Sequence, residues 1–554
     1  MFDKVLVANR GEAAVRIIRT LKEMGIKSVA IYSVADRDSL HVQLADEAVC
    51  VGASRPSDSY LNIKNIISAA TGTGAQAIHP GYGFLSESAE FASLCAACGL
   101  TFIGPKAETI DQMGNKEHAR QLMIKHKVPV TPGSRDFIKS PEEAKKVAAE
   151  VGYPVLLKAA AGGGGKGIRQ VKEPGEMADA FSLAQNEARL DFGNDQMYLE
   201  KVLTNVKHIE VQVIRDSFGS CVYFPERDCS LQRRKQKVIE ESPCELISES
   251  EREKLGQIAV RAAEAADYLN TGTIEFLMDQ DHNFYFMEMN TRLQVEHPVT
   301  EAITGTDLVE WQLRVASGEP LPKQQAELTI NGHAIEARIN AENPDNNFLP
   351  ATGTLNVYRT PTHSEFRVAD VRIDDGVREG DVISPYYDSM IAKLIVHAPT
   401  REQALAKLDQ ALAETRIVGL PNNVAFLRHL VQSDSFKYAN LDTALIEREK
   451  DVLFGQQRGE LPWLVATAIV NELAQEAQTQ NHDPFSKTDA WRAYSHYARP
   501  FDLVYHDKPL RAVISQLNEQ AKEQAFHLTI NTIAKTEKQG ADVVTPIYQG
   551  DVRY

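Results

Sequence analysis

The chain has 554 residues, of which 43% are hydrophobic and 25% charged; this is an ordinary globular composition, and the chain is too long for one hydrophobic core. We therefore expect about three or four domains. The net charge of −16 argues against a nucleic-acid surface, and no apolar run is long enough to span a bilayer, so neither nucleic acid nor a membrane is expected as a partner.

The start of the chain predicts a βαβ unit. Residues 4–8 are predicted to form a buried strand, residues 11–24 an amphipathic helix and residues 28–32 the next strand, with a right-handed crossover. The segment Asn9-Arg10-Gly11-Glu12 follows the first strand, but it lacks the glycine spacing of a dinucleotide fingerprint, so NAD is not predicted. Since the first strand begins almost at Met1, we expect no targeting segment before the fold.

A loop rich in glycine and polar groups, His79 to Glu87, follows a third strand. Loops at the carboxyl ends of strands are common ligand positions in open α/β sheets, although a plain structural turn is equally compatible with this segment.

Beyond Lys116 the pattern changes to helices and short strands. A strand at residues 155–158 leads into a loop, Gly162 to Gly167, that contains four consecutive glycines. Such a backbone can approach phosphate oxygens closely and move as a lid. It is not a Walker A motif, because no Ser or Thr follows its lysine. The cations that flank the glycines argue against a plain linker.

Three further segments precede the most informative stretch of the chain. Residues 197–203 are predicted to form a strand that leads to a hinge, which can hold an adenine against the backbone. The segment Arg227 to Lys237 is strongly basic in its second half, and in so acidic a chain its four cations favour an anion site. An amphipathic helix is predicted at residues 251–269.

The segment Phe284 to Pro298 is predicted to form one strand of a hairpin with residues 273–279, followed by the turn that leaves this strand. A four-residue loop at residues 280–283 would place Asp279 opposite Phe284 and Glu275 directly opposite Glu288. Facing carboxylates repel, and a divalent cation between them removes the repulsion.

The side-chain period of two places Asn290 on the same face as Glu288. Oxygen ligands of this kind suit Mg²⁺ or Mn²⁺ that bridges nucleotide phosphates. The alternative is a solvated hairpin face with ordinary surface acids. It is disfavoured because Arg292, Gln294 and Glu296 continue the polar series at every second position.

Taken in order and spacing, these motifs resemble biotin carboxylase, the ATP-grasp subunit or domain of biotin-dependent carboxylases. The resemblance covers about residues 1–446. It rests on the segments Ala8–Glu12, His79–Ser88, Gly162–Gly167, Arg227–Lys237 and Glu288–Pro298.

The resemblance implies an α/β and α+β multidomain fold with a Rossmann-like N-terminal domain, an ATP-grasp lid, an ATP-grasp core and a smaller helix-plus-β domain at the C-terminus. The expected boundaries are 1–115 for the N-terminal domain, 116–203 for the lid, 204–446 for the C-terminal carboxylase domain, 447–461 for a linker and 462–554 for the last domain.

By the same resemblance, ATP phosphorylates bicarbonate to carboxyphosphate, which releases CO₂ beside biotin so that N1′ of biotin is carboxylated. Glu296 matches the general base, Arg338 the arginine that stabilises the biotin enolate, and Lys237 and Arg292 two further catalytic cations. The bicarbonate and biotin pocket is implied to contain Lys237, Arg292, Gln294, Val295 and Tyr82. The implied ATP-binding residues are Lys116, Lys158, Gly163, Gly164, Gly165, Gly167, Glu200, Lys201, Leu203, His208 and Gln232. The metal ligands are Glu275, Glu288 and Asn290.

The last hundred residues are predicted to contain a helix at 463–477 and strands at 501–505, 510–514 and 526–530. This order resembles the domain by which acyl-CoA carboxylase α subunits dock onto a carboxyltransferase β subunit, and the segment Pro484 to Arg492 is similar to methylcrotonyl-CoA carboxylase α subunits. A plain accessory β domain is the alternative. No Met-Lys-Met biotinylation sequence occurs, so the biotinyl carrier domain is expected to have been truncated or to lie on another chain.

Other assignments remain open at this point. The acyl acceptor can also be propionyl-, acetyl- or geranyl-CoA, and an ATP-grasp ligase that ignores biotin or a non-catalytic subunit is a further alternative. Homo- and hetero-oligomers are expected. The six cysteines lack ligand spacing, which indicates a reducing compartment, either the bacterial cytoplasm or the mitochondrial matrix of a processed eukaryotic chain.

Overall fold

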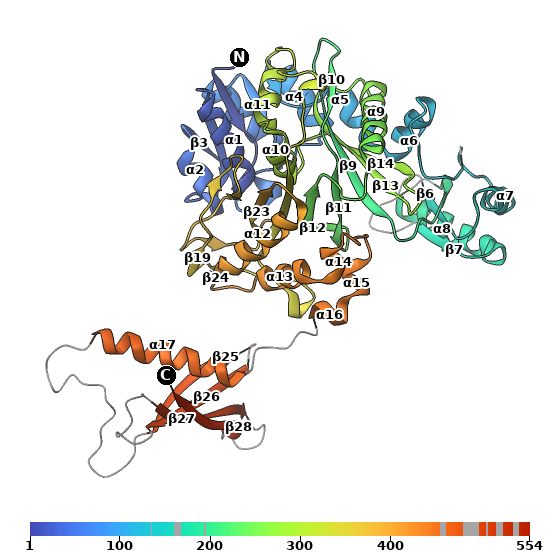
Figure 1. Cartoon of the computed structure of the whole chain (residues 1–554). Helices are drawn as coiled ribbons and strands as arrows, with labels where there is room; N and C mark the ends of the chain where they lie inside the picture. The colour runs from blue at the N-terminus through green and yellow to red at the C-terminus, as the bar shows by residue number, and fades with distance from the viewer. Residues whose placement is uncertain are drawn as a thin grey trace. The chain divides into compact units, whose positions relative to one another are not determined.

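The computed structural model describes residues 1–134, 136–159, 168–192, 195–454, 461–479, 498–505, 508–516, 525–535 and 542–553. The chain divides into two compact units, Met1–Phe454 and Gly455–Tyr554, and each has a hydrophobic core of its own (Figure 1). Of the helices described, none combines the length and the apolar character that crossing a membrane requires.

The large unit begins with a five-stranded parallel sheet in the order β3-β2-β1-β4-β5. Strand β1 is central because Val5 pairs with Ser28 of β2 on one side and with Ala77 of β4 on the other. The predicted βαβ unit is therefore confirmed. The elements are β1 Lys4–Val7, α1 Gly11–Glu23, β2 Lys27–Ser33, α2 Leu40–Leu44, β3 Glu47–Gly52, α3 Ile63–Thr73, β4 Ala77–His79, α4 Ala89–Ala97 and β5 Thr101–Phe102.

The next part of the chain builds a small antiparallel sheet in the order β7-β6-β8, with helices α7 and α8 packed around a separate apolar core. The predicted strands at 155–158 and 197–203 correspond to β6 and β8. The glycine-rich loop, with Gly163, Gly164, Gly165 and Gly167, lies outside the described residues. The elements are α5 Ala107–Gly114, α6 Lys116–Lys125, α7 Pro141–Val151, β6 Val155–Ala159, β7 Ile168–Val171, α8 Met177–Phe192 and β8 Met197–Lys201.

A ten-stranded sheet, mostly antiparallel, carries the candidate site. Its order is β14-β13-β9-β11-β12-β15-β23-β21-β20, with β10 paired to β9. The strands are β9 Lys207–Arg215, β10 Cys221–Tyr223, β11 Arg227–Arg233, β12 Gln236–Ser242, β13 Asn270–Met278, β14 Phe284–Asn290, β15 His333–Asn340, β20 Ser364–Glu365, β21 Val371–Asp375 and β23 Met390–Ala398.

Three helices pack near this sheet: α9 Glu249–Ala265, α10 His297–Thr304 and α11 Leu308–Ala316. Helix α9 begins two residues before the predicted start, because the Ser248 side chain accepts the Glu251 amide and Glu251 in turn accepts the Ser248 amide. It ends at Ala265, before the predicted Leu269.

The β13–β14 hairpin confirms the predicted facing pair but not the predicted loop. Glu275 lies directly opposite Glu288, as expected. The loop, however, has five residues, because Phe284 pairs with Met278 and not with Asp279. A β-bulge between the Phe276–Phe286 and Glu275–Glu288 pairs inserts Met287 and restores the expected register. Two errors in the prediction therefore cancel at the pair that matters.

Helices α12 to α16 complete the large unit. The last two lie where a linker was predicted. Residues 447–454 were expected to be linker, but α15 and α16 extend through them. Phe454 stacks on Phe426 at a centroid distance of 5.2 Å, and Leu453 is buried in the same core, so apolar packing holds this segment on the unit. The elements are β16 Glu342–Asn343, β17 Leu349–Pro350, β18 Gly353–Thr354, β19 Val357–Arg359, β22 Val382–Ile383, α12 Arg401–Glu414, β24 Arg416–Val418, α13 Val424–Gln432, α14 Asp434–Lys437, α15 Leu445–Arg448 and α16 Lys450–Phe454.

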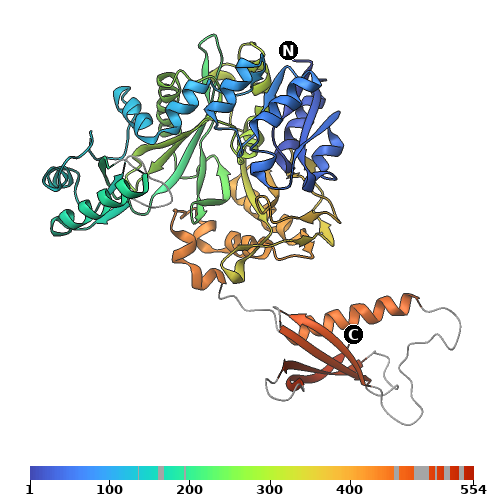
Figure 2. The same cartoon turned by 180° about the vertical axis from the view of Figure 1, so that it is seen from behind.

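The second unit consists of helix α17 and a four-stranded antiparallel sheet in the order β25-β26-β27-β28 (Figure 2). The predicted helix and three strands are confirmed. The fourth strand was not predicted, because Pro546 and Gly550 interrupt its apolar pattern. The elements are α17 Leu461–Thr479, β25 Ala498–Tyr505, β26 Lys508–Gln516, β27 Ala525–Lys535 and β28 Asp542–Arg553.

Candidate active site

Charged side chains from several strands of the ten-stranded sheet surround Lys237 on β12. Its Nζ lies 2.6 Å from Glu210 Oε2 on β9, 3.0 Å from Glu275 Oε1 on β13 and 2.6 Å from Glu296 Oε1. Burial alone would lower the pKa of this amine, but the three carboxylates raise its pKa well above the ordinary value. Lys237 is therefore a cation at any physiological pH.

Glu296 occupies the N-cap position of α10, at the end of the segment that leaves β14. Its carboxylate is fully buried and accepts a hydrogen bond of 2.8 Å from Arg338 Nη2 in addition to that from Lys237. Burial alone would raise the pKa of Glu296, but the charges of Lys237 and Arg338 lower that pKa well below its ordinary value. The carboxylate is ionised at neutral pH, which is the form that can accept a proton.

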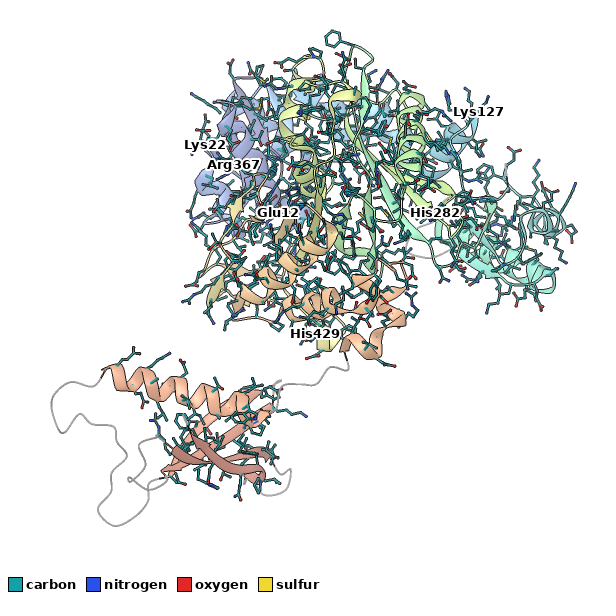
Figure 3. The ribbon with its side chains drawn as sticks, in the orientation of Figure 1. Glu12, Lys22, Lys127, His282, Arg367 and His429 are labelled. Carbon is teal, nitrogen blue, oxygen red and sulfur yellow. The ribbon has the colours of Figure 1, made fainter. Side chains whose placement is uncertain are left out.

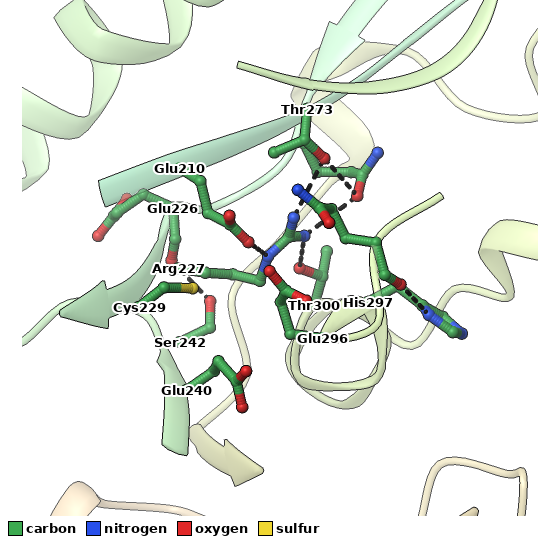
Figure 4. Close-up of polar contacts among 12 residues, drawn as sticks. Glu210, Glu226, Arg227, Cys229, Glu240, Ser242, Thr273, Glu296, His297 and Thr300 are labelled. Carbon is green, nitrogen blue, oxygen red and sulfur yellow. Dashed lines mark hydrogen bonds and ion pairs between the residues drawn. The ribbon is translucent and has the colours of Figure 1, made fainter. Parts of the chain in front are cut away.

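A second buried cation, Arg227 on β11, donates hydrogen bonds to residues of the cluster (Figure 4). Its Nε donates to Glu210, its Nη1 donates to Thr300 Oγ1 at 2.9 Å, and its Nη2 donates to Thr273 Oγ1 at 3.2 Å. Glu210 thus bridges Arg227 and Lys237. This bridge links the three strands β9, β11 and β12 beside Glu296.

The basic segment around residues 233–237 does not converge on one site. Arg234 and Lys235 form the turn between β11 and β12 with positive φ, and the Arg233 guanidinium lies 4.1 Å over the Phe348 ring. Of the four cations, only Lys237 reaches the carboxylate cluster. Arg234 and Lys235 lie in the turn, whereas Lys237 lies within β12 itself.

A cavity of about 860 Å³ opens beside the cluster. Three of the five residues expected at the bicarbonate and biotin pocket line it, Tyr82, Arg292 and Val295, together with Arg338, whereas Lys237 and Gln294 are not among its lining residues. The structure therefore brings together residues that are more than two hundred positions apart in the sequence. Glu240 holds Arg338 in place: the Arg338 Nε donates a hydrogen bond of 2.6 Å to Glu240 Oε1.

The cavity wall is supported by residues that the sequence did not indicate. Lys393 on β23 donates to the Val295 carbonyl at 3.0 Å, and its Nζ lies 5.8 Å from the centre of the Tyr82 ring. Its counter-ion is Glu12, 3.4 Å away, in the interior of the large unit (Figure 3). Asn9 donates to the Tyr82 carbonyl at 2.8 Å. The segment Asn9 to Glu12, for which no dinucleotide was predicted, thus supports this wall.

Arg292, Gln294 and Asn290 form one chain of hydrogen bonds. Arg292 donates to Gln294 Oε1 at 2.8 Å and to Asn290 Oδ1 at 3.1 Å, and its Nε lies 3.2 Å from Glu87 Oε2. Gln294 Nε2 in turn donates to Glu275 Oε1 at 3.0 Å. The polar series predicted from alternation is therefore one connected network.

The predicted metal ligands lie together, and each carboxylate already has a cationic neighbour. Lys116 Nζ is 2.8 Å from Glu288 Oε2, while Glu275 contacts Lys237 and lies 3.1 Å from His208 Nε2. Asn290 Nδ2 donates to Glu275 at 2.7 Å. Two carboxylates and an amide oxygen are a donor set that fits Mg²⁺. The cations balance the two charges here, so the metal stays a prediction.

The expected nucleotide residues fall into two groups in the described part of the chain. Lys116 contacts Glu288, whereas Lys158 contacts Glu200 across the β6–β8 pair. Lys201 donates to the carbonyls of Gly152 and Tyr153 at 2.7 and 3.0 Å, so its amine braces the sheet. The remaining three lie on or beside strands: Leu203 follows β8 and is half-buried, His208 lies on β9, and Gln232 on β11 donates to the Cys229 carbonyl at 3.0 Å.

Three carboxylates of the cluster were not predicted: Glu210, Glu240 and Glu336, which lie on β9, β12 and β15. All three are fully buried. A signal existed, because each directly follows a buried isoleucine of its strand, where an unpaired charge is costly. Which cation each one meets depends on the strand order, and that was not available from the sequence.

Comparison with known protein families finds three matches along the large unit. Residues 1–110 match the family model described as biotin carboxylase, N-terminal domain. Residues 115–324 match the carbamoyl-phosphate synthase L chain, ATP binding domain. Residues 336–448 match the biotin carboxylase C-terminal domain.

Curated relatives extend this similarity. The chain is 48% identical to biotin carboxylase 1 of Bacillus subtilis, over 81% of this chain and 98% of that protein. It is 48% identical to the mitochondrial methylcrotonoyl-CoA carboxylase subunit alpha of Arabidopsis thaliana over 91% of this chain and 69% of that protein. The corresponding mouse subunit is 51% identical, over 81% and 62%.

Solved structures agree with these relatives. The biotin carboxylase domain of the 2-oxoglutarate carboxylase of Hydrogenobacter thermophilus, in complex with MgADP and bicarbonate, is 45% identical over 83% of this chain and 100% of that one, with a TM-score of 0.75. A biotin carboxylase of Campylobacter jejuni in a β,γ-ATP complex is 46% identical over 81% of this chain and 99% of that one, also with a TM-score of 0.75.

Proposed function

Since the chain belongs to the biotin carboxylase family of ATP-dependent ligases, we propose that it carboxylates N1′ of biotin with ATP and bicarbonate as part of a methylcrotonyl-CoA carboxylase α subunit. The observation that carries this proposal is the ionised Glu296 carboxylate, which is held by Lys237 and by Arg338, a residue that lines the large cavity.

We assign the bicarbonate pocket to Lys237, Arg292, Gln294 and the Val295 backbone. Bicarbonate is a weak nucleophile that still carries a proton, so it needs cations to bind its charge and a carboxylate to accept that proton. Glu296 is the base in this assignment. Its contacts with two cations orient the carboxylate but also weaken it as a base, because they lower its pKa.

Bicarbonate binding removes part of this weakness. The anion competes with Glu296 for Lys237 and adds a like charge, and both effects raise the pKa of Glu296 toward the operating pH. We predict that the acidic limb of kcat lies at higher pH than that of kcat/KM for bicarbonate, since these profiles report the bound and the free enzyme respectively. Coincident or reversed limbs would contradict the assignment of Glu296.

Arg338 and Tyr82 are assigned to biotin. Removing the proton from N1′ places negative charge on the ureido oxygen, and a fixed guanidinium beside it stabilises that charge. Arg338 is suited to this task because its contacts with Glu240 and Glu296 use Nε and Nη2, so Nη1 remains for a ligand in the cavity.

The nucleotide is assigned to a site that includes Lys116 and Lys158. Lys116 and Lys158 neutralise phosphate charge, while Glu200, Lys201, Leu203, His208 and Gln232 surround the rest of the nucleotide. Glu275, Glu288 and Asn290 hold Mg²⁺, which lowers the barrier to phosphoryl transfer by neutralising charge. The glycines Gly163, Gly164, Gly165 and Gly167 are proposed to cover the phosphates.

The acyl acceptor and the partners are inferred from the relatives. The match with the Arabidopsis α subunit extends over 511 residues, compared with 448 for the Bacillus biotin carboxylase, so it includes sequence beyond the carboxylase domains. We infer a carboxyltransferase β subunit and a biotinyl carrier domain as partners, in homo- and hetero-oligomers. Propionyl-, acetyl- and geranyl-CoA remain alternative acceptors, and the location is the bacterial cytoplasm or the mitochondrial matrix.

The identity of the acyl acceptor is tested by supplying the proposed partners of this chain. The chain is mixed with a biotinylated carrier domain and a methylcrotonyl-CoA carboxylase β subunit, and incorporation of labelled bicarbonate into each acyl-CoA is measured. We expect methylcrotonyl-CoA to be labelled fastest and only when the chain is present. If the chain instead supports β subunits specific for propionyl- or acetyl-CoA and fails with this one, the methylcrotonyl assignment is wrong.

A further inference from the structure

Two buried carboxyl groups face each other behind Arg338. Glu240 on β12 lies directly opposite Glu336 on β15, and both side chains are fully buried. Directly opposite residues of an antiparallel pair have Cβ atoms about 5 Å apart, so two ionised carboxylates at these positions would repel strongly. Arg338 is two residues after Glu336 on the same face of β15.

The hydrogen bonds of this pair are incomplete in a specific way. Glu240 Oε1 accepts from Arg338 at 2.6 Å, but Glu240 Oε2 and both oxygens of Glu336 meet no donor among the described residues. A buried carboxylate without any donor is very costly, whereas a protonated carboxyl carries its own donor. The missing donor is therefore explained if the pair itself contains a proton.

The charged groups around Glu336 also favour a neutral acid. On neighbouring elements it faces Glu240 of β12, Lys393 of β23 and Glu296 at the start of α10. Lys393 is already matched by Glu12 and lies 3.8 Å from Asp374. His297 of α10 is buried, and the positive charges of Lys393 and two arginines add to burial in lowering its pKa, so it supplies no charge.

The titration of both acids agrees with the geometry. Burial raises the pKa of Glu336 well above its ordinary value, and the charge of Glu240 raises it further against the opposing effect of Lys393. Burial raises the pKa of Glu240 to about 7, with Arg338 opposing the shift. Groups that interact this strongly titrate as a pair.

We propose that Glu240 and Glu336 share one proton, with the Glu336 carboxyl donating to the free oxygen of Glu240, and that the resulting single negative charge positions Arg338 for biotin. Glu336 is in this view a positioning residue that acts through Glu240. The role toward biotin rests on the proposed function, whereas the shared proton is a property of the folded protein alone.

The shared proton is tested by thermal unfolding of the full chain across pH, without substrates. A folded-state pKa above the unfolded value means that stability declines as pH rises above about 4.5. Glu336→Gln removes this decline, so the Tm of the variant minus that of the wild type should increase with pH. Glu240→Gln should leave part of the decline, because burial alone still raises the pKa of the remaining Glu336.

Glu241→Gln is the matched control, on the same strand but on its opposite face. Burial would raise the pKa of Glu241, but His333 and Arg401 lower that pKa to about 2. Its stabilising effect is present at neutral pH and lost as pH falls from about 4.5 toward 2, so this variant should be least stable, relative to wild type, at neutral pH. A Tm difference for Glu336→Gln that is independent of pH, or that has the sign of the control, would overturn the proposal.

A second measurement, biotin-dependent turnover, tests whether the pair positions Arg338, independently of whether it shares a proton. Biotin-dependent turnover should fall by less than about threefold in Glu336→Gln, which keeps the negative charge of Glu240 beside Arg338, and by about tenfold or more in Glu240→Gln, which removes that charge. Equal losses, or a larger loss in Glu336→Gln, would overturn the positioning role. If the wild type itself ignores biotin, the proposed function fails, while the unfolding experiment still decides whether the proton is shared.

Discussion

At the scale of single residues, the properties of the site depend on Glu296 and the two cations that hold it. Lys237 Nζ and Arg338 Nη2 lie 2.6 and 2.8 Å from its two oxygens, and the carboxylate has no exposure to water. A base in this position is ionised and oriented before substrate arrives. Its strength then depends on how far bicarbonate draws the two cations away.

Glu296→Gln keeps the shape of the side chain but removes the base. We expect turnover to fall by about a hundredfold or more, because general base catalysis typically contributes this much, while the affinity for ATP stays nearly unchanged. The measurement is bicarbonate-dependent ATP hydrolysis together with a nucleotide-binding titration. Turnover at the wild-type rate would disprove the role of Glu296 as base.

Arg338→Ala separates the two halves of the reaction. Since Arg338 is assigned to the biotin enolate, its removal should reduce biotin carboxylation more than bicarbonate-dependent ATP hydrolysis. Both rates are measured on the same preparation, with Arg401→Ala as the control; this buried arginine pairs with Glu241 away from the cavity. Equal losses in the two rates of Arg338→Ala would argue against a role in binding biotin.

At the scale of elements, alternation along β14, which ends at Asn290, predicted the facing pair Glu275 and Glu288; the polar series Arg292, Gln294 and Glu296 lies in the segment between β14 and α10. Alternation succeeded at the pair because the period of two is a local property of the backbone. It did not predict the bulge at Met287, which depends on a loop one residue longer than expected. Nor could it identify Glu210 or Lys393, whose partners lie on strands that become neighbours only through the sheet order.

The end of the large unit shows the same limit, because its last helix was predicted to be linker. The charges of residues 447–451 dominate the pattern there, whereas the apolar contacts of Leu453 and Phe454 are made with side chains far earlier in the sequence. Phe454 lies 5.7 Å from Phe348 and 5.2 Å from Phe426, measured between ring centres.

Phe454→Ala tests this correction. The loss of two aromatic contacts should lower the free energy of unfolding of the large unit by about 2 kcal/mol, as measured by denaturant titration. Phe218→Ala, at a position that is 67% exposed, should change it by less than about 0.5 kcal/mol. If the two variants are equally stable, residues 450–454 contribute nothing to the core.

At the scale of the whole molecule, the two units have separate cores, and every residue assigned to the chemistry lies in the first. The last of the three family matches ends at residue 448. The chain covers 98% of a bacterial biotin carboxylase but 69% and 62% of two α subunits. We therefore predict that the half-reaction on biotin requires only the large unit.

A chain that ends after Phe454 should accordingly keep bicarbonate-dependent ATP hydrolysis within about twofold of the full chain. A chain that ends after Ile446 lacks α16 and should be less stable, because Leu453 and Phe454 no longer cover the core. Both are compared by activity and by thermal unfolding. Loss of activity in the longer of the two would place part of the active site in the second unit.

The most direct test of the assigned chemistry is ATP hydrolysis by the wild-type chain with Mg²⁺, measured with and without bicarbonate and with and without free biotin. A biotin carboxylase that uses Glu296 and Arg338 as assigned should hydrolyse ATP slowly alone, faster with bicarbonate, and faster again when biotin is added. Hydrolysis that is indifferent to both bicarbonate and biotin would contradict the assignment of this pocket.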